Sequence, residues 1–120
     1  MGYILVFIDG TICDDRHRFS LYGTVEFLSD NEIMKDVPVE NSVVCLCELA
    51  DRYKITYIGA RSQKTSIITQ KWLNYVGFPK GELFLAETQN ERLQITHELK
   101  KNRNFITGIG DRWDDNELHV

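Results

Sequence analysis

The chain has 120 residues, of which 42% are hydrophobic and 27% are charged, and its formal net charge is −4. This length suits one domain with one core, and the composition is globular rather than disordered. The acidic balance, without a long basic run, does not favour nucleic acid as a partner. The longest apolar run is far too short to span a membrane.

The chain contains three cysteines, Cys13, Cys45 and Cys47, and no signal-peptide pattern. An odd number argues against a disulfide framework, so we expect reduced thiols and a cytoplasmic location. Cys45 and Cys47 are two residues apart in a helical pattern, where their side chains point in different directions. We therefore predict that they do not bind a metal ion together and that both pack against the core.

The first predicted element is a strand over residues 3–8, YILVFI, which ends at Asp9-Gly10. It is apolar on both faces, which is typical of a central strand in a parallel sheet. Residues 13–37 are polar and irregular, and a short helix is expected around residues 24–27. We predict that this stretch is a cap-like excursion over the edge of the sheet.

A helical pattern follows over about residues 39–53, and a second strand is expected over residues 55–58. Ser62 is a suitable N-cap for a helix over about residues 63–76, which Gly77 closes. The apolar faces of these two helices consist of Val43, Leu46, Cys47 and Ala50 in the first and of Ile68, Trp72 and Val76 in the second.

The last predicted elements are a short strand over residues 82–85, a helix over about 89–101 and a strand over 105–109. Thr88 and Glu91 form a plausible capping box at the start of that helix. Strands and helices thus alternate, which predicts right-handed crossovers and a parallel sheet.

The predicted fold class is α/β, a single three-layer, Rossmann-like domain over residues 1–120. We expect a mostly parallel sheet of about four strands with helices on both faces. In such sheets, ligands bind at the carboxyl ends of the strands. Three of these ends carry distinctive residues, which we expect to meet in one cleft: Asp9-Gly10-Thr11, Gly59-Ala60-Arg61 and the segment GDRWDD at 110–115.

The residues at these strand ends suit a phosphate and a hard cation. Asp9 and Asp111 offer the oxygen ligands that Mg²⁺ prefers, and Asp115 could orient them. Gly10, Thr11 and Arg61 offer hydrogen bonds to a phosphate group. Each aspartate taken alone is better explained as a turn or capping residue, because Asp-Gly and Gly-Asp are common turn dipeptides. Their convergence favours a site.

The same segments resemble motifs of the haloacid-dehalogenase-like (HAD) phosphatase superfamily. FIDGTI at 7–12 is similar to the first motif, D-x-D-G-T-[LIV], and GDRWDD is similar to the fourth, G-D-x-x-x-D. Residues 57–79 resemble the second, in which a strand ends in T-[GA]-R and a helix often closes with W-L-x-x-x-G-[FI]-P. The match covers nearly the whole chain except residues 13–37. Its nearest type is the small phosphatases with a minimal cap, including the phosphatase domain of polynucleotide kinases.

The resemblance implies a set of roles. Asp9 falls on the position of the general acid and base, and Asp111 on that of the Mg²⁺ ligand, while Thr11, Arg61 and Asp115 match their motif positions. In the superfamily, a first aspartate attacks the phosphorus and a Thr or Ser of the second motif binds the phosphoryl group. No lysine clearly fits the third motif, for which the candidates are Arg92, Lys80 and Lys100.

Two positions depart from the superfamily pattern, because Phe7 stands at the nucleophile position and Gly59 at that of the phosphate-binding hydroxyl. A phenyl ring cannot attack phosphorus or bind Mg²⁺, so an aspartyl-phosphate cannot form there. We expect Phe7 to lie at the mouth of the cleft and Mg²⁺ to bind weakly. The prediction is a catalytically impaired phosphatase-like domain, a pseudoenzyme, that binds a phosphate-bearing small molecule, a nucleotide or a protein.

Two alternatives stay open. One is an active Mg²⁺-dependent phosphomonoester hydrolase, in which Asp14, Asp15 or a water activated by Asp9 replaces the missing nucleophile. The other is a non-enzymatic assembly module, since the sheet is minimal and a partner chain, such as a second copy, could cover one edge. Among the aromatic residues, we expect Trp72 in the core and Trp113 near the cleft, and we expect His17 in a solvated loop.

Overall fold

Four parallel strands form the centre of the structure, a computed structural model that describes residues 2–14, 16–17 and 29–109. In the order β5-β4-β1-β6, they are β5 (Gly81–Leu85), β4 (Lys54–Gly59), β1 (Tyr3–Phe7) and β6 (Phe105–Ile109). β1 pairs in parallel with both β4 and β6. Its run of apolar residues therefore predicted a central strand correctly.

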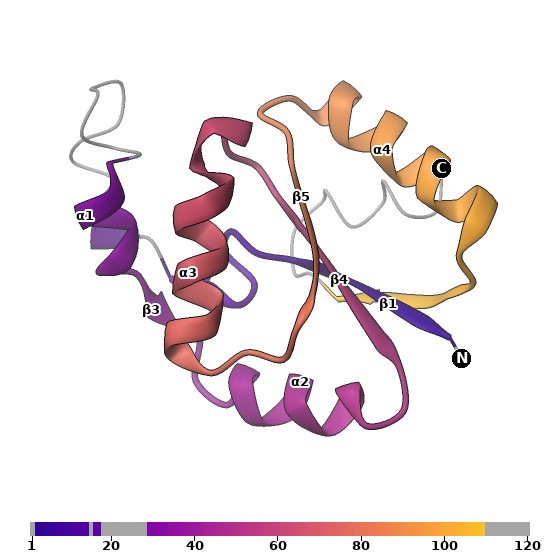
Figure 1. Ribbon diagram of the computed structural model, residues 1–120, viewed down its shortest axis with the longest axis horizontal. Coiled ribbons are helices and arrows are strands. Elements are labelled where there is room, and N and C mark those ends of the chain that lie inside the picture. The colour runs from indigo at the N-terminus through magenta and orange to yellow at the C-terminus, as the bar shows by residue number, and fades with distance from the viewer. Residues whose placement is uncertain (1, 15, 18–28, 110–120) are drawn as a thin grey trace.

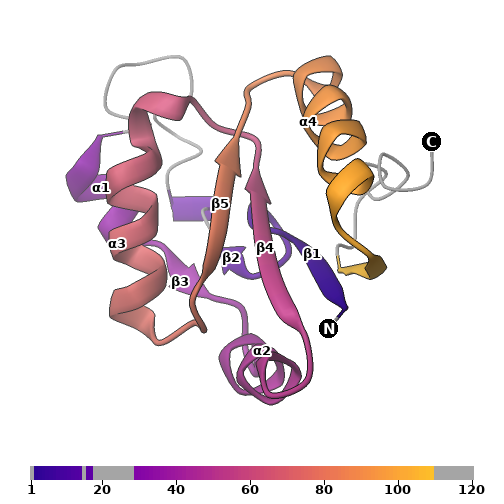
Figure 2. The same ribbon diagram turned by 45° about the vertical axis from the view of Figure 1, so that its right-hand side comes forward.

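Helices cover both faces of this sheet, which makes three layers (Figures 1 and 2). The helices α2 (Ser42–Ala50) and α3 (Ser66–Val76) pack on one face, and α4 (Gln89–Asn102) packs on the other. Side chains alternate along β1, so that it contributes to two cores. The larger core contains Ile4, Val6 and Ile8, and the smaller one contains Leu5 and Phe7.

The ends of the helices follow the capping signals in the sequence. The Thr88 hydroxyl accepts a hydrogen bond from the Glu91 amide at 3.2 Å, which confirms Thr88 as the N-cap of α4. The Glu91 Oε1 accepts from the Thr88 hydroxyl at 2.9 Å rather than from the Thr88 amide, as a full capping box would have it. Gly77 closes α3 with a φ of 100°. Ser62 caps a 3₁₀ turn, η3 (Gln63–Thr65), which comes directly before α3.

The excursion after β1 returns to the body of the domain. Its two-residue strand β2 (Cys13–Asp14) pairs antiparallel with β3 (Val37–Pro38), and the short helix α1 (Asp30–Met34) lies between them. Ile33 of α1 is buried in the larger core together with Ile68 of α3. The helix expected around residues 24–27 lies outside the described residues.

The prediction that both cysteines of α2 pack against the core is wrong. Cys45 and Cys47 are exposed, and Leu46 is the buried residue of this helix, with Val43 and Ala50 half-buried. Successive residues of a helix are about 100° apart, so a narrow buried stripe leaves both neighbours of Leu46 at the surface.

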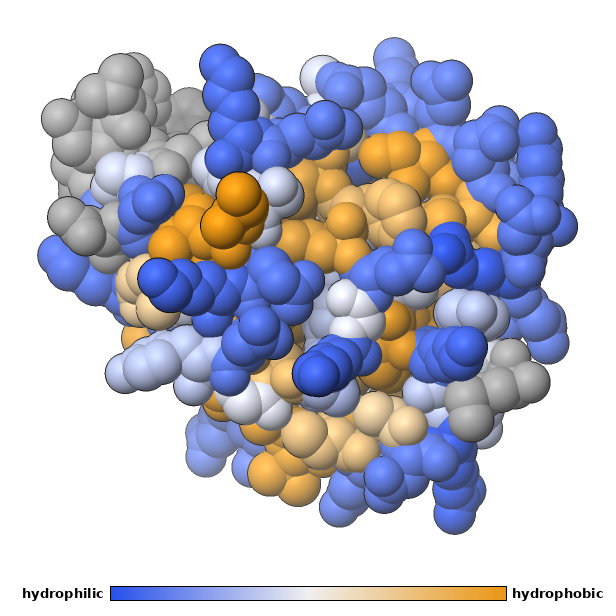
Figure 3. All heavy atoms as spheres, in the orientation of Figure 1, coloured by the Kyte–Doolittle hydropathy of each residue, from blue (hydrophilic) through white to orange (hydrophobic). Residues whose placement is uncertain are grey.

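The surface carries some apolar side chains. Ile67, in the first turn of α3, has 84% of its surface exposed. Figure 3 shows apolar groups among the hydrophilic side chains on the face that is turned towards the viewer. Within the described part of the chain, no helix is both long and apolar enough to cross a membrane.

Candidate functional site

The loop after β1 is a tight turn that carries Asp9. Gly10 adopts a φ of 78°, a left-handed conformation that favours glycine. The amides of Thr11, Ile12 and Cys13 all donate to the carbonyl oxygen of Ile8 at 3.0–3.2 Å, and the Gly10 amide donates to Cys13 O at 3.1 Å. The amides of Gly10 and Thr11 therefore have acceptors inside the loop.

Asp9 reaches from this loop to the end of β4. Its Oδ2 accepts a hydrogen bond from the Ala60 amide at 2.8 Å. Its Oδ1 accepts from Arg61 Nη2 at 2.5 Å and from Arg61 Nε at 3.1 Å. The first two predicted strand ends thus meet, and the residues expected to share a ligand bind each other.

Arg61 is buried, with 2% of its side chain exposed, and it contacts more than Asp9. Nη1 donates to Thr69 Oγ1 at 3.2 Å, and Nη2 lies 3.8 Å from Asp36 Oδ2. Burial acts to lower the pKa of this guanidinium, but the neighbouring Asp9, Cys13 and Asp36 outweigh it and hold the pKa above its ordinary value. Arg61 is therefore a buried cation with the carboxylates of Asp9 and Asp36 both close to its Nη2.

Asp36 is a member of the site that sequence reasoning missed. Its carboxylate is completely buried, accepts a hydrogen bond from Cys13 Sγ at 3.1 Å and lies 3.5 Å from His17 Nε2. The ring of His17 also lies 3.8 Å from the carboxylate of Glu32 in α1. Nothing in the sequence around Asp36 marks it, because its place depends on how β3 returns along β2.

Phe7 is the last residue of β1, directly below this loop. Only 6% of its surface is exposed, and it packs with Leu5 and Ile58 in the smaller core. The expectation that it lies at the mouth of the cleft is therefore wrong, because its ring points to the face of the sheet that α4 covers. No carboxylate stands at this position of the strand.

Gly59 ends β4 and is buried against the same loop. A Cβ added there would lie 3.3 Å from Asp9 Oδ2 and 2.8 Å from Leu85 Cδ2. The carboxylate of Asp9 thus occupies the space beside position 59.

Two solved structures show which fold this arrangement belongs to. The first is the class C acid phosphatase from Bacillus anthracis with tungstate bound, with a TM-score of 0.72, 18% identity, and coverage of 95% of this chain and 53% of that chain. The second is a chain of the Pnkp1/Rnl/Hen1 RNA repair complex, with a TM-score of 0.73, 14% identity, and coverage of 98% of this chain and 38% of that chain. The chain has a HAD-like phosphatase fold.

The similarity of this chain to the two solved structures concerns the fold alone. At these identities it does not carry over an activity, and the chain spans about half of the first matched chain and less of the second. No protein-family profile matches the sequence, and no curated protein matches it.

Some of the other residues that the sequence analysis singled out lie in the described part of the chain, and some lie outside it. Arg92 is buried in α4, where its Nη1 donates to the carbonyl oxygen of Ala86 at 3.0 Å. Lys80 lies near the start of β5, at the opposite end of the sheet from Asp9, and Lys100 lies in the last turn of α4. Asp111, Trp113 and Asp115 lie outside the described residues. Trp72 is completely buried, as predicted.

The described residues do not by themselves fit Mg²⁺. Among residues 2–14, 16–17 and 29–109, no group of three His, Cys, Asp or Glu side chains is placed to hold a metal ion. Both oxygens of Asp9 accept hydrogen bonds from Ala60 or Arg61, and a cation beside Asp9 would lie close to a guanidinium.

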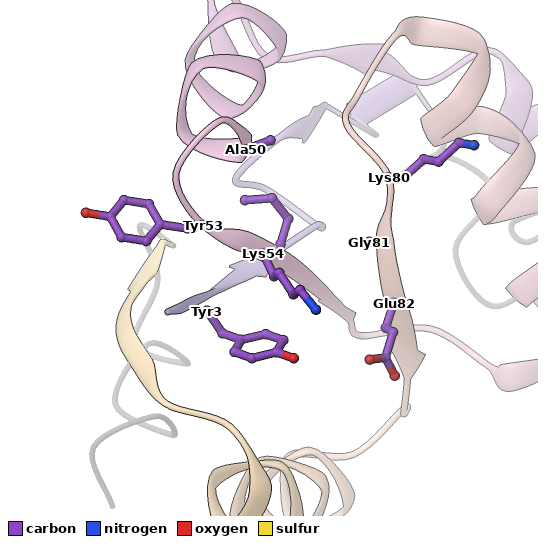
Figure 4. A pocket seen from close by; sticks show the side chains of 8 residues that line it. Tyr3, Ala50, Tyr53, Lys54, Lys80, Gly81 and Glu82 are labelled. Atoms are coloured by element: carbon purple, nitrogen blue, oxygen red, sulfur yellow. The ribbon is translucent and has the colours of Figure 1, made fainter. Parts of the chain in front are cut away.

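A separate hollow of about 520 Å³ lies at the amino ends of the strands (Figure 4). Tyr3, Lys54 and Glu82 gather in it, whereas Lys80 and Tyr53 point away from them. Lys54 Nζ lies 5.8 Å from the centre of the Tyr3 ring, and the Arg103 guanidinium lies 5.5 Å from it. This hollow is at the opposite end of the sheet from Asp9 and Arg61, so it takes no part in the candidate site.

Proposed function

We propose that this chain is a catalytically impaired domain of the HAD-like phosphatase fold that binds a phosphate-bearing ligand. The observation that carries the proposal is the packing of Phe7 at the end of β1. Phe7 stands at the position that the sequence resemblance assigns to the nucleophile, and its ring is buried in the smaller core rather than in the cleft. Covalent catalysis needs an activated nucleophile, and a phenyl ring supplies none.

The proposed binding groups lie at the carboxyl ends of β1 and β4. Arg61 and the Ala60 amide supply charged and neutral donors, and Thr11 supplies a hydroxyl. Gly10 and Ala60 are both exposed, which gives an anion access from solvent. A phosphate-bearing small molecule or nucleotide is the ligand class that these groups suit.

Mg²⁺ is proposed to bind this site only weakly. Asp9, Asp111 and Asp115 are the proposed carboxylates for it, and Asp9 is already paired with Arg61. We expect weak Mg²⁺ binding, because a hard cation depends on its anionic oxygen ligands and Phe7 provides none.

The proposal is tested by an assay of Mg²⁺-dependent hydrolysis of p-nitrophenyl phosphate, together with a titration of inorganic phosphate. We expect the wild type to bind phosphate and to show no turnover above buffer. Phe7→Asp should gain turnover, whereas the neutral, equally small Phe7→Asn should not. Turnover by the wild type that Asp9→Asn abolishes would contradict the proposal and favour a hydrolase with a displaced nucleophile.

Both Phe7 variants remove a ring from the smaller core. They should lose similar amounts of stability, roughly 3–5 kcal/mol for a large core residue made small. Circular dichroism at the assay temperature must show that each is folded. The comparison between Asp and Asn then isolates the effect of the carboxylate.

A second candidate function is assembly with another copy of this chain. Within the described part of the chain, β5 pairs only with β4, so its other edge is unpaired, and the apolar Ile67 is exposed on the neighbouring α3. Sedimentation velocity tests this role. A dimer that Ile67→Lys weakens would support it, and a monomer at tens of micromolar would exclude it.

A further inference from the structure

We propose that the carboxylate of Asp9 occupies the anion-binding donors of this site itself, so that a phosphate-bearing ligand binds only by displacing it. The inference rests on the proposed function and adds how access to the site is controlled. The structure assigns the site to three donors: the Ala60 amide, Arg61 Nε and Arg61 Nη2.

The contacts of Asp9 are those of a bound anion. One oxygen accepts from a backbone amide at 2.8 Å, and the other accepts from two nitrogens of one guanidinium at 2.5 and 3.1 Å. A charged acceptor surrounded by an amide and an arginine is the usual arrangement for a carboxylate or phosphate ligand in a protein. Here the anion is part of the chain.

Gly59 relieves a tight contact with this carboxylate. A Cβ at position 59 would lie 3.3 Å from Asp9 Oδ2, which is closer than ordinary van der Waals contact. The missing side chain leaves room for the carboxylate beside the Ala60 amide. The two departures from the superfamily pattern then have separate effects: Phe7 removes the nucleophile, and Gly59 leaves room for Asp9 beside the donors.

The donors would keep their positions if Asp9 left. Arg61 Nη1 donates a hydrogen bond to Thr69 Oγ1 at 3.2 Å, and the buried Asp36 Oδ2 lies 3.8 Å from Arg61 Nη2. Thr69 therefore holds the guanidinium nitrogen that does not bond to Asp9. Asp9 is the more exposed member of the pair, with 12% of its side chain exposed against 2% for Arg61, so it is the member expected to move when a ligand binds.

An internal competitor lowers the apparent affinity of a ligand by the fraction of molecules in which the donors are available. If Asp9 leaves them in about one molecule in ten or fewer, removing its charge should raise the affinity for phosphate roughly tenfold or more. Asp9→Asn keeps the size of the side chain and removes that charge. Asp51→Asn is the matched control, because Asp51 is an exposed residue at the end of α2 and its loss changes the net charge equally.

The experiment is a titration of each protein with inorganic phosphate at about 0.15 M salt, which screens distant charges beyond roughly 8 Å. Binding is followed by calorimetry and by the NMR signals of the Ala60 amide and Arg61 Nε–H. We expect Asp9→Asn to bind at least about tenfold more tightly than the wild type and Asp51→Asn to bind like the wild type. Phosphate should shift both NMR signals.

The outcomes separate the inference from the proposed function. Equal affinity in the wild type and Asp9→Asn, or an equal gain in Asp51→Asn, would overturn the inference and leave phosphate binding intact. Binding to neither protein would overturn both. If Asp9→Asn does not fold, the wild type decides alone, because phosphate that binds without shifting the Ala60 and Arg61 signals does not displace Asp9.

Discussion

Asp36 Oδ2 lies 3.8 Å from Arg61 Nη2, and both side chains are almost completely buried. The two residues come from different parts of the chain, since Asp36 precedes β3 in the excursion and Arg61 follows β4 in the body. The Cys13 thiol also contacts Asp36. This contact therefore ties the excursion to the strand ends that carry the candidate site.

Removal of this carboxylate should destabilise the protein. Asp36→Ala removes one of the two carboxylates close to the buried Arg61 and leaves Asp9 beside it, and we expect a loss of about 3 kcal/mol in the free energy of unfolding. Urea denaturation measures it. Glu40→Ala, at an exposed position, should stay within about 0.5 kcal/mol. A loss at Asp36 no larger than that at Glu40 would show that the contact is not stabilising.

Trp72 should matter for the position of Asp36 as well as for the core. Its indole Nε1–H donates to the carbonyl oxygen of Asp36 at 2.9 Å, and its ring is completely buried. Trp72→Phe removes the donor and part of the ring, so we expect a loss of about 2 kcal/mol in the free energy of unfolding.

The matched control for Trp72 is Tyr75→Phe, because Tyr75 lies on the same helix and 76% of its surface is exposed. Thermal and urea denaturation of both variants should show a clear loss at position 72 and almost none at position 75. Equal losses would mean that the helix itself, and not the buried hydrogen bond, is affected.

The sequence predicted the strands and helices well, because these follow from local patterns. The apolar run of β1 could only be buried on both faces, and the Thr88–Glu91 pair closes a local ring of hydrogen bonds. Cys47 was predicted wrongly for the same local reason. Its spacing fits an apolar face, but α2 buries only a narrow stripe around Leu46.

The candidate site was predictable only in part. Parallel strands predicted that the loops of Asp9 and Arg61 would meet, and they do. That the two residues bind each other depends on a distance of a few ångströms, which no sequence pattern fixes. Asp36 was missed because its neighbours in the sequence carry no motif. It comes close to Arg61 only because β3, which follows it directly, pairs with β2.

The three thiols should react at very different rates. Burial and then the Asp36 carboxylate raise the pKa of the Cys13 thiol above its ordinary value, so its thiolate is scarce at pH 8. Cys45 and Cys47 are exposed. With an aromatic disulfide reagent, we expect two thiols to react quickly in the folded protein and the third only after unfolding. A Cys45→Ser, Cys47→Ser double variant that still reacts quickly would contradict this.

Asp14 and Arg16 make a local ion pair whose pH dependence can be worked out. Arg16 Nη2 lies 2.6 Å from Asp14 Oδ2, and its hydrogen bonds lower the pKa of Asp14 to about 2. A lowered pKa means that the folded state favours the ionised carboxylate. Any stability from the pair is therefore present above the unfolded pKa of about 3.9 and is lost as the pH falls towards 2.

Carboxyl ¹³C NMR measures this titration directly. The midpoint of Asp14 should lie near 2 in the wild type and return towards about 3.9 in Arg16→Ala, since the guanidinium is the cause of the shift. Arg52→Ala removes an equal charge at an exposed position near the end of α2 and should leave the midpoint unchanged. Because the pair is exposed, added salt should also raise the wild-type midpoint. An Asp14 midpoint that is the same with and without Arg16 would mean that the pair does not persist in solution.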